Sequence, residues 1–133
     1  MTLLLLDTTV LVNAERRGSR LDHLIEDDDE VAIAAVTAAE LLVGVMVAAP
    51  RYRSKRAAFV EAALESIPIL SYDLVVARVH ADLLSSTRVA GRPRGAHDLI
   101  IAATGRAHER TIVTGDTSGF DALPGVIVRT ASH

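Results

Sequence analysis

Short apolar runs alternate with longer amphipathic segments along most of this chain. The apolar runs predict buried strands at residues 2–6, 31–36, 68–70, 111–114 and 126–128. The segments between them predict helices over residues 8–17, 37–47, 52–66 and 98–108, a helix from a cap at Ser71 or Asp73 to residue 89, and a short helix over 19–26.

Strands that alternate with helices indicate a parallel α/β sheet. We therefore expect an α/β fold with a central sheet of about five strands flanked by helices. A length of 133 residues is typical of one domain, so residues 1–133 are expected to form a single unit. Hydrophobic residues make up 50% of the chain and aromatic residues only 3%, which predicts an aliphatic core of the kind that parallel sheets have.

Composition also excludes several classes of function and location. The chain contains no cysteine, which rules out cysteine-based zinc sites, thiol catalysis and disulfides. The first apolar run has no basic segment before it and stops at Asp7, unlike a signal peptide, and the longest uncharged apolar stretch, 41–49, is too short to span a membrane. We expect a cytoplasmic protein.

Four carboxylates lie beside the predicted elements in a common position. Asp7 follows the first strand and Asp116 follows the fourth, whereas Glu40 and Asp98 lie near the starts of two helices. In a parallel sheet, the carboxyl ends of the strands and the helix starts that follow them share one edge, and ligands bind there. The sequence therefore predicts that these four side chains lie together.

Each carboxylate also has a local explanation. Thr37 and Glu40 have the spacing of a capping box, Asp7 and Asp98 can cap or charge a helix start, and Asp116 lies in a Gly-Asp-Thr-Ser-Gly turn. Capping explains each residue separately but does not explain why all four lie at one edge.

A divalent cation explains the four carboxylates together. No Lys or Arg lies within three residues of any of them, so nothing nearby in the sequence offsets their charge. Mg²⁺ prefers oxygen ligands and tolerates several carboxylates. The chain has neither a nucleophile elbow nor a phosphate-binding P-loop, so the chemistry expected is metal-assisted attack of water on a nucleic-acid phosphodiester.

The phrases around the four carboxylates resemble those of a known family. LLDTTVLV, TAAELLVG, HDLIIAATG and IVTGDTSGF are similar to motifs of PIN-domain proteins, specifically the VapC toxins of bacterial type II toxin–antitoxin systems. The resemblance covers the whole chain. It implies a PIN-like three-layer fold and a Mg²⁺-dependent, or Mn²⁺-dependent, endoribonuclease that inhibits translation.

The resemblance also implies roles for individual residues. Asp7 and Asp98 match the primary metal ligands, and Glu40 and Asp116 match residues that hold a second metal or orient waters. Thr8 and Thr114 match polar positions that support the site. The last acidic position is often Asn in the family, so Asp116 adds negative charge here.

The partners implied by the resemblance are RNA, a second copy of the chain and a VapB-type antitoxin. Such an antitoxin wraps the toxin and often places a basic side chain in the acidic pocket, where it can neutralise the carboxylates. The apolar residues of 41–49 exceed what one buried helix face needs, which leaves some available to a partner or to a buried core.

Other charged residues leave alternatives open. The chain has a formal net charge of −3, but basic residues cluster at 51–56 and 88–94, where they form either solvated surfaces or phosphate contacts. His97 adjoins Asp98 but is expected to have no role at the site, since Mg²⁺ prefers oxygen.

Two other functions compete with a nuclease. A non-catalytic RNA- or protein-binding module on a PIN fold is the alternative, although the complete acidic set argues against a decayed site. A phosphoacceptor signalling domain needs a Lys beside the acidic site, and Lys55, the only Lys in the chain, lies far from the acidic motifs in the sequence.

Overall fold

A parallel sheet forms the centre of the computed structural model, which describes residues 1–18, 27–91 and 94–131. The strands are β1 (Leu3–Leu6), β2 (Glu30–Ala34), β3 (Ile69–Leu70), β4 (Thr111–Thr114) and β5 (Val128–Thr130). The helices are α1 (Thr8–Arg17), α2 (Ala35–Met46), α3 (Pro50–Ser66), α4 (Leu74–Ala90), α5 (Ala96–Ala107) and the short 3₁₀ helix η2 (Thr117–Gly119).

All strand pairs are parallel, in the order β3-β2-β1-β4-β5. Strand β1 lies in the middle, with Leu4 opposite Val31 of β2 and Leu5 opposite Ile112 of β4. The predicted α/β class and the five-stranded parallel sheet are confirmed. Because β1 and β4 are neighbours, the residues that follow them, Asp7 and Gly115, emerge side by side.

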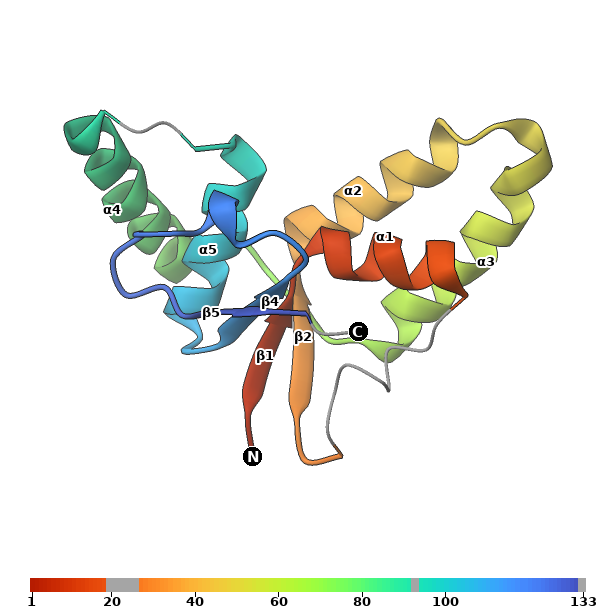
Figure 1. Ribbon diagram of the computed structural model, residues 1–133, viewed down its shortest axis with the longest axis horizontal. Helices are drawn as coiled ribbons and strands as arrows, with labels where there is room; N and C mark the ends of the chain where they lie inside the picture. Colours follow the sequence, from red (N-terminus) through yellow and green to blue (C-terminus); the bar gives the residue numbers. More distant parts are fainter. Residues whose placement is uncertain (19–26, 92–93, 132–133) are drawn as a thin grey trace.

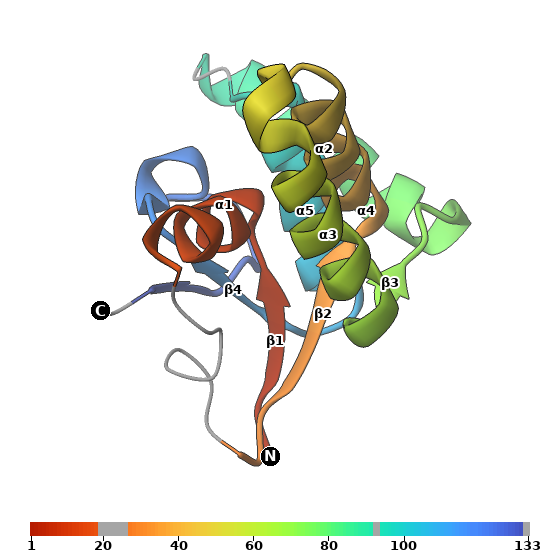
Figure 2. The ribbon, with the colours of Figure 1, turned by 90° about the vertical axis from the view of Figure 1, so that its right-hand side faces the viewer.

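Helices cover both faces of the sheet, which gives three layers (Figure 1). Alternate residues of β1 divide between two cores: Leu5 packs with residues of α4 and α5, whereas Leu4 and Leu6 pack with residues of α1, α2 and α3. Figure 2 shows α2 and α3 on the near side of the sheet, with α4 and α5 behind them. The apolar strand runs are therefore buried on both faces, as their sequences predicted.

The helix boundaries correct one prediction that bears on the site. Helix α2 begins at Ala35, two residues before Thr37, and its N-cap Ala34 makes no side-chain cap hydrogen bond. The expected Thr37–Glu40 capping box is therefore wrong, because both residues already lie inside the helix. The apolar residues Ala35 and Val36 continue the strand pattern, so the sequence did not mark the boundary.

The boundaries of other helices and strands differ from the predicted ones by a few residues. Helix α3 starts at Pro50, whose fixed φ suits the first helical position, and β5 lies two residues later than predicted. Asp73 is the cap of α4, since its side chain accepts from the Val76 N–H. The predicted helix over 19–26 lies outside the described residues. In the parts of the chain that the structure describes, no helix is long and apolar enough to cross a membrane.

Candidate metal-binding site at the carboxyl edge of the sheet

Asp7 is the most firmly held carboxylate of the edge. It is only 4% exposed and follows the central strand as the N-cap of α1. Oδ1 accepts from the Thr8 backbone N–H at 2.8 Å, and Oδ2 accepts from the hydroxyls of Thr9 at 3.0 Å and Thr114 at 2.7 Å. Three donors therefore fix the orientation of an almost fully buried carboxylate. The Asp7 side chain both caps α1 and presents a fixed carboxylate at the edge of the sheet.

Glu40 is held from two sides. The Thr8 hydroxyl donates to Oε1 at 2.7 Å, and His97 Nδ1 lies 3.1 Å from Oε2. A carboxylate can only accept, so the imidazole is the donor in this contact. Helices α1, α2 and α5 thus meet at Glu40, with the buried Thr37 one turn earlier on α2 and 3.3 Å from the Thr8 hydroxyl.

Asp98 lies in the first turn of α5 but does not cap it, because Gly95 occupies the N-cap position. Its carboxylate is in close contact with η2: a Cβ built on Gly119 would lie 2.5 Å from Asp98 Oδ2. A side chain at residue 119 would therefore displace the carboxylate, and only glycine leaves room for it.

Asp116 completes the edge from the segment after β4. It is exposed and is the N-cap of η2, where Oδ1 accepts from the Ser118 N–H at 3.0 Å. Arg94, which precedes α5, donates to the carbonyl of Ser118 at 2.8 Å and to that of Asp121. One basic residue of the 88–94 cluster therefore ties the segment that carries Asp116 to the segment before Asp98.

The electrostatics of the edge show that the other three carboxylates act on Asp98. Burial raises the pKa of Asp98, the negative charges of Asp7, Glu40 and Asp116 raise it further, and His97 opposes them. Hydrogen bonding by Ser118 lowers the pKa of Asp116, which favours its charged form. The structure thus brings together all four residues that the sequence singled out, at an edge with excess negative charge.

The donor set fits a hard divalent cation. Every acidic side chain at the edge offers carboxylate oxygen, the ligand that Mg²⁺ and Mn²⁺ prefer. Within residues 1–18, 27–91 and 94–131, no three acidic or histidine side chains lie close enough to enclose an ion by themselves. Mg²⁺ usually binds one or two carboxylates and keeps several waters, so it does not require three such side chains.

Comparison with known proteins decides the family. The model of the PIN domain matches residues 4–126. The chain belongs to the PIN-domain family. PIN-domain ribonucleases generally depend on divalent metal ions.

Among curated PIN-domain relatives, Toxin FitB of Neisseria gonorrhoeae is 34% identical over 131 residues, which cover 89% of this chain and 91% of FitB. Ribonuclease VapC5 of Mycobacterium tuberculosis is 37% identical over 123 residues, which cover 90% of this chain and 87% of VapC5. Among solved structures, VapBC-5 from Mycobacterium tuberculosis is similar with a TM-score of 0.79 and 32% identity over 100% of both chains. FitAcB from Neisseria gonorrhoeae has a TM-score of 0.76 and 34% identity, and the match covers 94% of this chain and 95% of that chain.

Sequence reasoning missed two residues at this PIN-domain edge, His97 and Gly119. His97 was expected to play no part, yet its ring contacts Glu40, which comes from another helix 57 residues earlier. Gly119 was not singled out, although its lack of a side chain makes room for Asp98. The only local signal for Gly119 was its place directly before the buried Phe120 in the acidic turn, and the only one for His97 was that it adjoins Asp98.

Proposed function

We propose that this chain is a metal-dependent endoribonuclease toxin that hydrolyses RNA phosphodiester bonds and thereby inhibits translation. The observation that carries the proposal is the position of Asp98 beside Asp7, Glu40 and Asp116 at the ligand-binding edge of a PIN fold, where burial and their charges raise its pKa. The naming of similar proteins as ribonucleases and toxins supports the substrate class.

We assign the metal-binding and catalytic roles to Asp7, Glu40, Asp98 and Asp116. Asp7 and Asp98 are the primary ligands: Asp7 because three donors hold its carboxylate in place, Asp98 because burial and the neighbouring carboxylates raise its pKa, an effect that a bound cation would offset. Glu40 and Asp116 hold a second ion or orient waters. Thr8 and Thr114 support these ligands by donating to Glu40 and Asp7.

Mg²⁺ is the cation proposed, with Mn²⁺ as a substitute. When bound, such an ion offsets the charge of the phosphodiester and lowers the pKa of a water that attacks phosphorus. The residues of the chain do the rest: Asp7 presents a fixed oxygen, and Glu40, positioned by Thr8 and His97, faces the same edge.

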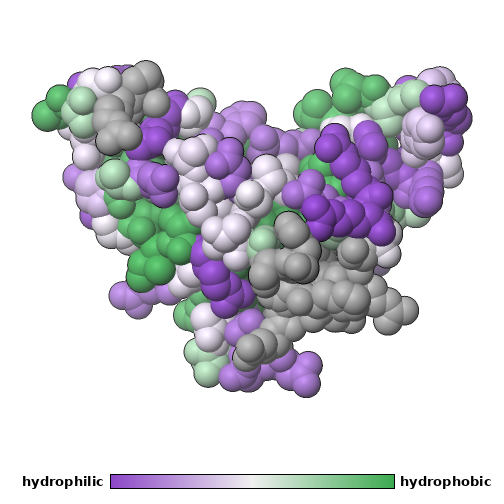
Figure 3. Space-filling view, in the orientation of Figure 1, coloured by the Kyte–Doolittle hydropathy of each residue, from purple (hydrophilic) through white to green (hydrophobic). Residues whose placement is uncertain are grey.

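We further propose a VapB-type antitoxin and a homodimer as partners, and the cytoplasm as the place of action. Similar chains occur in structures whose names describe VapBC and FitAB complexes. In α2 and the turn after it, Leu42, Val43, Met46 and Val47 are exposed, the last two by 73% and 75%. Figure 3 shows hydrophobic surface over this part of the molecule, which suits burial by a protein partner.

The test is cleavage of total cellular RNA by antitoxin-free protein, in Mg²⁺ and in EDTA. Cleavage in Mg²⁺ that EDTA abolishes and that Asp98→Asn lacks is the expected result. Folded wild-type protein that binds RNA in Mg²⁺ and in Mn²⁺ without cleaving it would instead identify a binding module on a PIN fold.

A further inference from the structure

A groove of about 500 Å³ lies between the last turn of α1 and the first half of α3, at the end of α1 opposite Asp7. We call it the α1–α3 groove. Its lining is basic and aromatic, with one acidic residue, Glu15. The side chains concerned are Arg16, Arg17, Tyr52, Lys55, Arg56 and Phe59.

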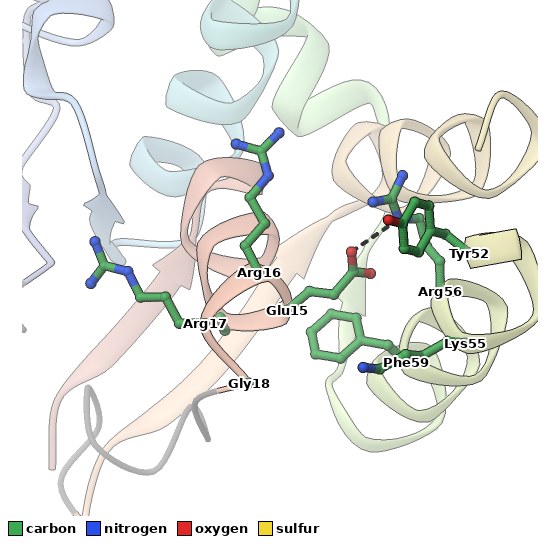
Figure 4. Close-up of a pocket in the computed structure, with 9 residues that line it drawn as sticks. Glu15, Arg16, Arg17, Gly18, Tyr52, Lys55, Arg56 and Phe59 are labelled. Carbon is green, nitrogen blue, oxygen red and sulfur yellow. Dashed lines mark hydrogen bonds and ion pairs between the residues drawn. The ribbon is translucent and has the colours of Figure 1, made fainter. Parts of the chain in front are cut away.

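Two of the cations near the groove serve the fold. Arg56 Nε forms an ion pair with Glu15 at 2.9 Å, which joins α3 to α1 across the groove (Figure 4). Arg53 donates to the Ala48 carbonyl at 2.9 Å and so closes the turn between α2 and α3. These contacts account for Arg53 and Arg56 without any ligand.

The remaining cations of α3 have no such explanation. Arg51 lies in the first turn of α3, where the helix dipole disfavours positive charge and no acidic residue is present, and Lys55 lies one turn later. Neither forms a hydrogen bond or an ion pair with any residue that the structure describes. Both cations are stabilised once an anion binds beside them.

Arg16 and Arg17 add charge from the other wall of the groove. They lie in the last turn of α1, where the dipole favours cations, so their presence is explained by the helix itself. Figure 4 shows both side chains extending outward from α1, away from Phe59. Their charge reaches the surface beside the groove and widens the basic area.

Aromatic rings give the groove a second property. Tyr52 is 51% exposed, and the Arg51 guanidinium lies over its ring at 4.8 Å from the centroid. Phe59 is partly buried and extends from α3 toward Glu15 of α1 (Figure 4). Cations beside exposed aromatic faces are the combination by which proteins bind single-stranded nucleic acid, with phosphates at the cations and bases on the rings.

We propose that the α1–α3 groove, together with Arg51 beside it, binds the RNA chain a few nucleotides away from the bond that is cut, with Lys55 and Arg51 at phosphates and Tyr52 beneath a base. This inference rests on the proposed function for the identity of the polyanion. Helix α1 has ten residues and is therefore about 15 Å long, which corresponds to roughly four stacked nucleotides. One strand can thus contact the acidic edge and the groove together.

The experiment measures binding of a fluorescently labelled 12-nucleotide single-stranded RNA of mixed sequence, in EDTA and over a range of salt concentrations. The variants are Arg51→Gln/Lys55→Gln and Tyr52→Leu, all at exposed positions, and Arg78→Gln on α4 is the matched control. We expect the double variant to bind at least about tenfold more weakly, with the slope of log affinity against log salt reduced by about 1.4. Tyr52→Leu weakens binding by about fivefold or more and leaves the slope unchanged.

Wild-type affinity in both groove variants, or an equal loss in Arg78→Gln, would overturn the inference. Unchanged RNA binding together with loss of the antitoxin from a co-expressed complex would also overturn it and assign the groove to the protein partner. Because no cleavage occurs in EDTA, the result is independent of the proposed activity. Groove-dependent binding without cleavage in Mg²⁺ would retain the groove and reject the nuclease.

Discussion

The two ends of α1 carry opposite charge and hold it in opposite ways. At the start, Asp7 is almost fully buried and accepts three hydrogen bonds, and its neighbours Glu40 and Asp98 are acidic. At the end, Arg16 and Arg17 are exposed, and the α1–α3 groove beside them is basic.

On our proposals, the difference reflects what each end recognises: a metal ion at the start of α1 and a polynucleotide at its end. Metal-assisted chemistry needs oxygens fixed in position, because small displacements reduce the rate strongly. A polynucleotide chain is flexible and is held by long basic side chains that adapt to it. A net charge of −3 conceals this separation, which is visible only when the charges are placed on the fold.

The largest effect is expected at the acidic end. Asp98→Asn or Asp7→Asn should reduce RNA cleavage in Mg²⁺ by more than about 100-fold, because each removes a charged metal ligand. Mutating a residue that only hydrogen-bonds to a metal ligand already reduces activity by about 10- to 100-fold. Cleavage is measured by gel electrophoresis of total RNA. The control is Asp121→Asn, whose exposed side chain lies on the same segment as Asp116 and which should cleave as the wild type does. Full activity in both site variants would reject the assignment.

A smaller loss is expected when a methyl group is placed against Asp98. Gly119→Ala builds a Cβ 2.5 Å from Asp98 Oδ2, so the carboxylate must move, and cleavage should fall by about 10- to 100-fold. Because the contact is with the end of a side chain, the midpoint of thermal unfolding should change little. Gly44→Ala in α2 is the matched control, since nothing lies within 4 Å of its added Cβ. Equal activity of the two variants would contradict a fixed Asp98.

The hydroxyl behind Asp7 provides a third comparison. Thr114→Val removes the 2.7 Å donor to Asp7 Oδ2 from a fully buried position, and cleavage should fall by about tenfold. Thr104→Val removes an equally buried hydroxyl that donates only to the Ile100 carbonyl within α5. If both variants lose the same activity at matched stability, the Thr114 hydroxyl does not position Asp7.

The smallest effect concerns stability without metal. Because the pKa of Asp98 is raised above its ordinary 3.8, the folded protein binds this proton more tightly than the unfolded chain does. The stabilisation from this bound proton is fully present below the pKa that Asp98 has in the unfolded chain. It is lost as pH rises through the higher pKa of Asp98 in the folded protein, so ionised Asp98 lowers stability at neutral pH. In EDTA at pH 7, Asp98→Asn should therefore unfold a few degrees higher, on the order of 1–5 °C, with the difference vanishing toward pH 4.

Calorimetry or circular dichroism measures this shift, with Asp27→Asn, an exposed aspartate far along the chain, as the control. A variant less stable than the wild type at pH 7 would show that the Asp98 charge is compensated within the fold. Higher stability with lost cleavage would show that the acidic edge is maintained for function at the expense of stability.

Most of the fold could be predicted from local patterns. The apolar runs at β1 and β4 and the Gly18 that ends α1 marked their elements within a residue, because burial on two faces and a left-handed cap each leave a local signature. The start of α2 could not be predicted, since Ala35 and Val36 suit a strand and a helix equally. That residues 1–133 form a single domain stays a prediction.

By itself, the sequence determined the parallel α/β class, the aliphatic core and the four carboxylates at one edge, because strand and helix periodicity and the direction of parallel strands are encoded locally. Only the tertiary structure decided which groups those carboxylates meet. His97 reaches Glu40, Gly119 makes room for Asp98, and Arg56 pairs with Glu15 across the groove. These contacts join residues between 21 and 57 positions apart, and the packing of helices on the sheet, which no local pattern records, brings them together.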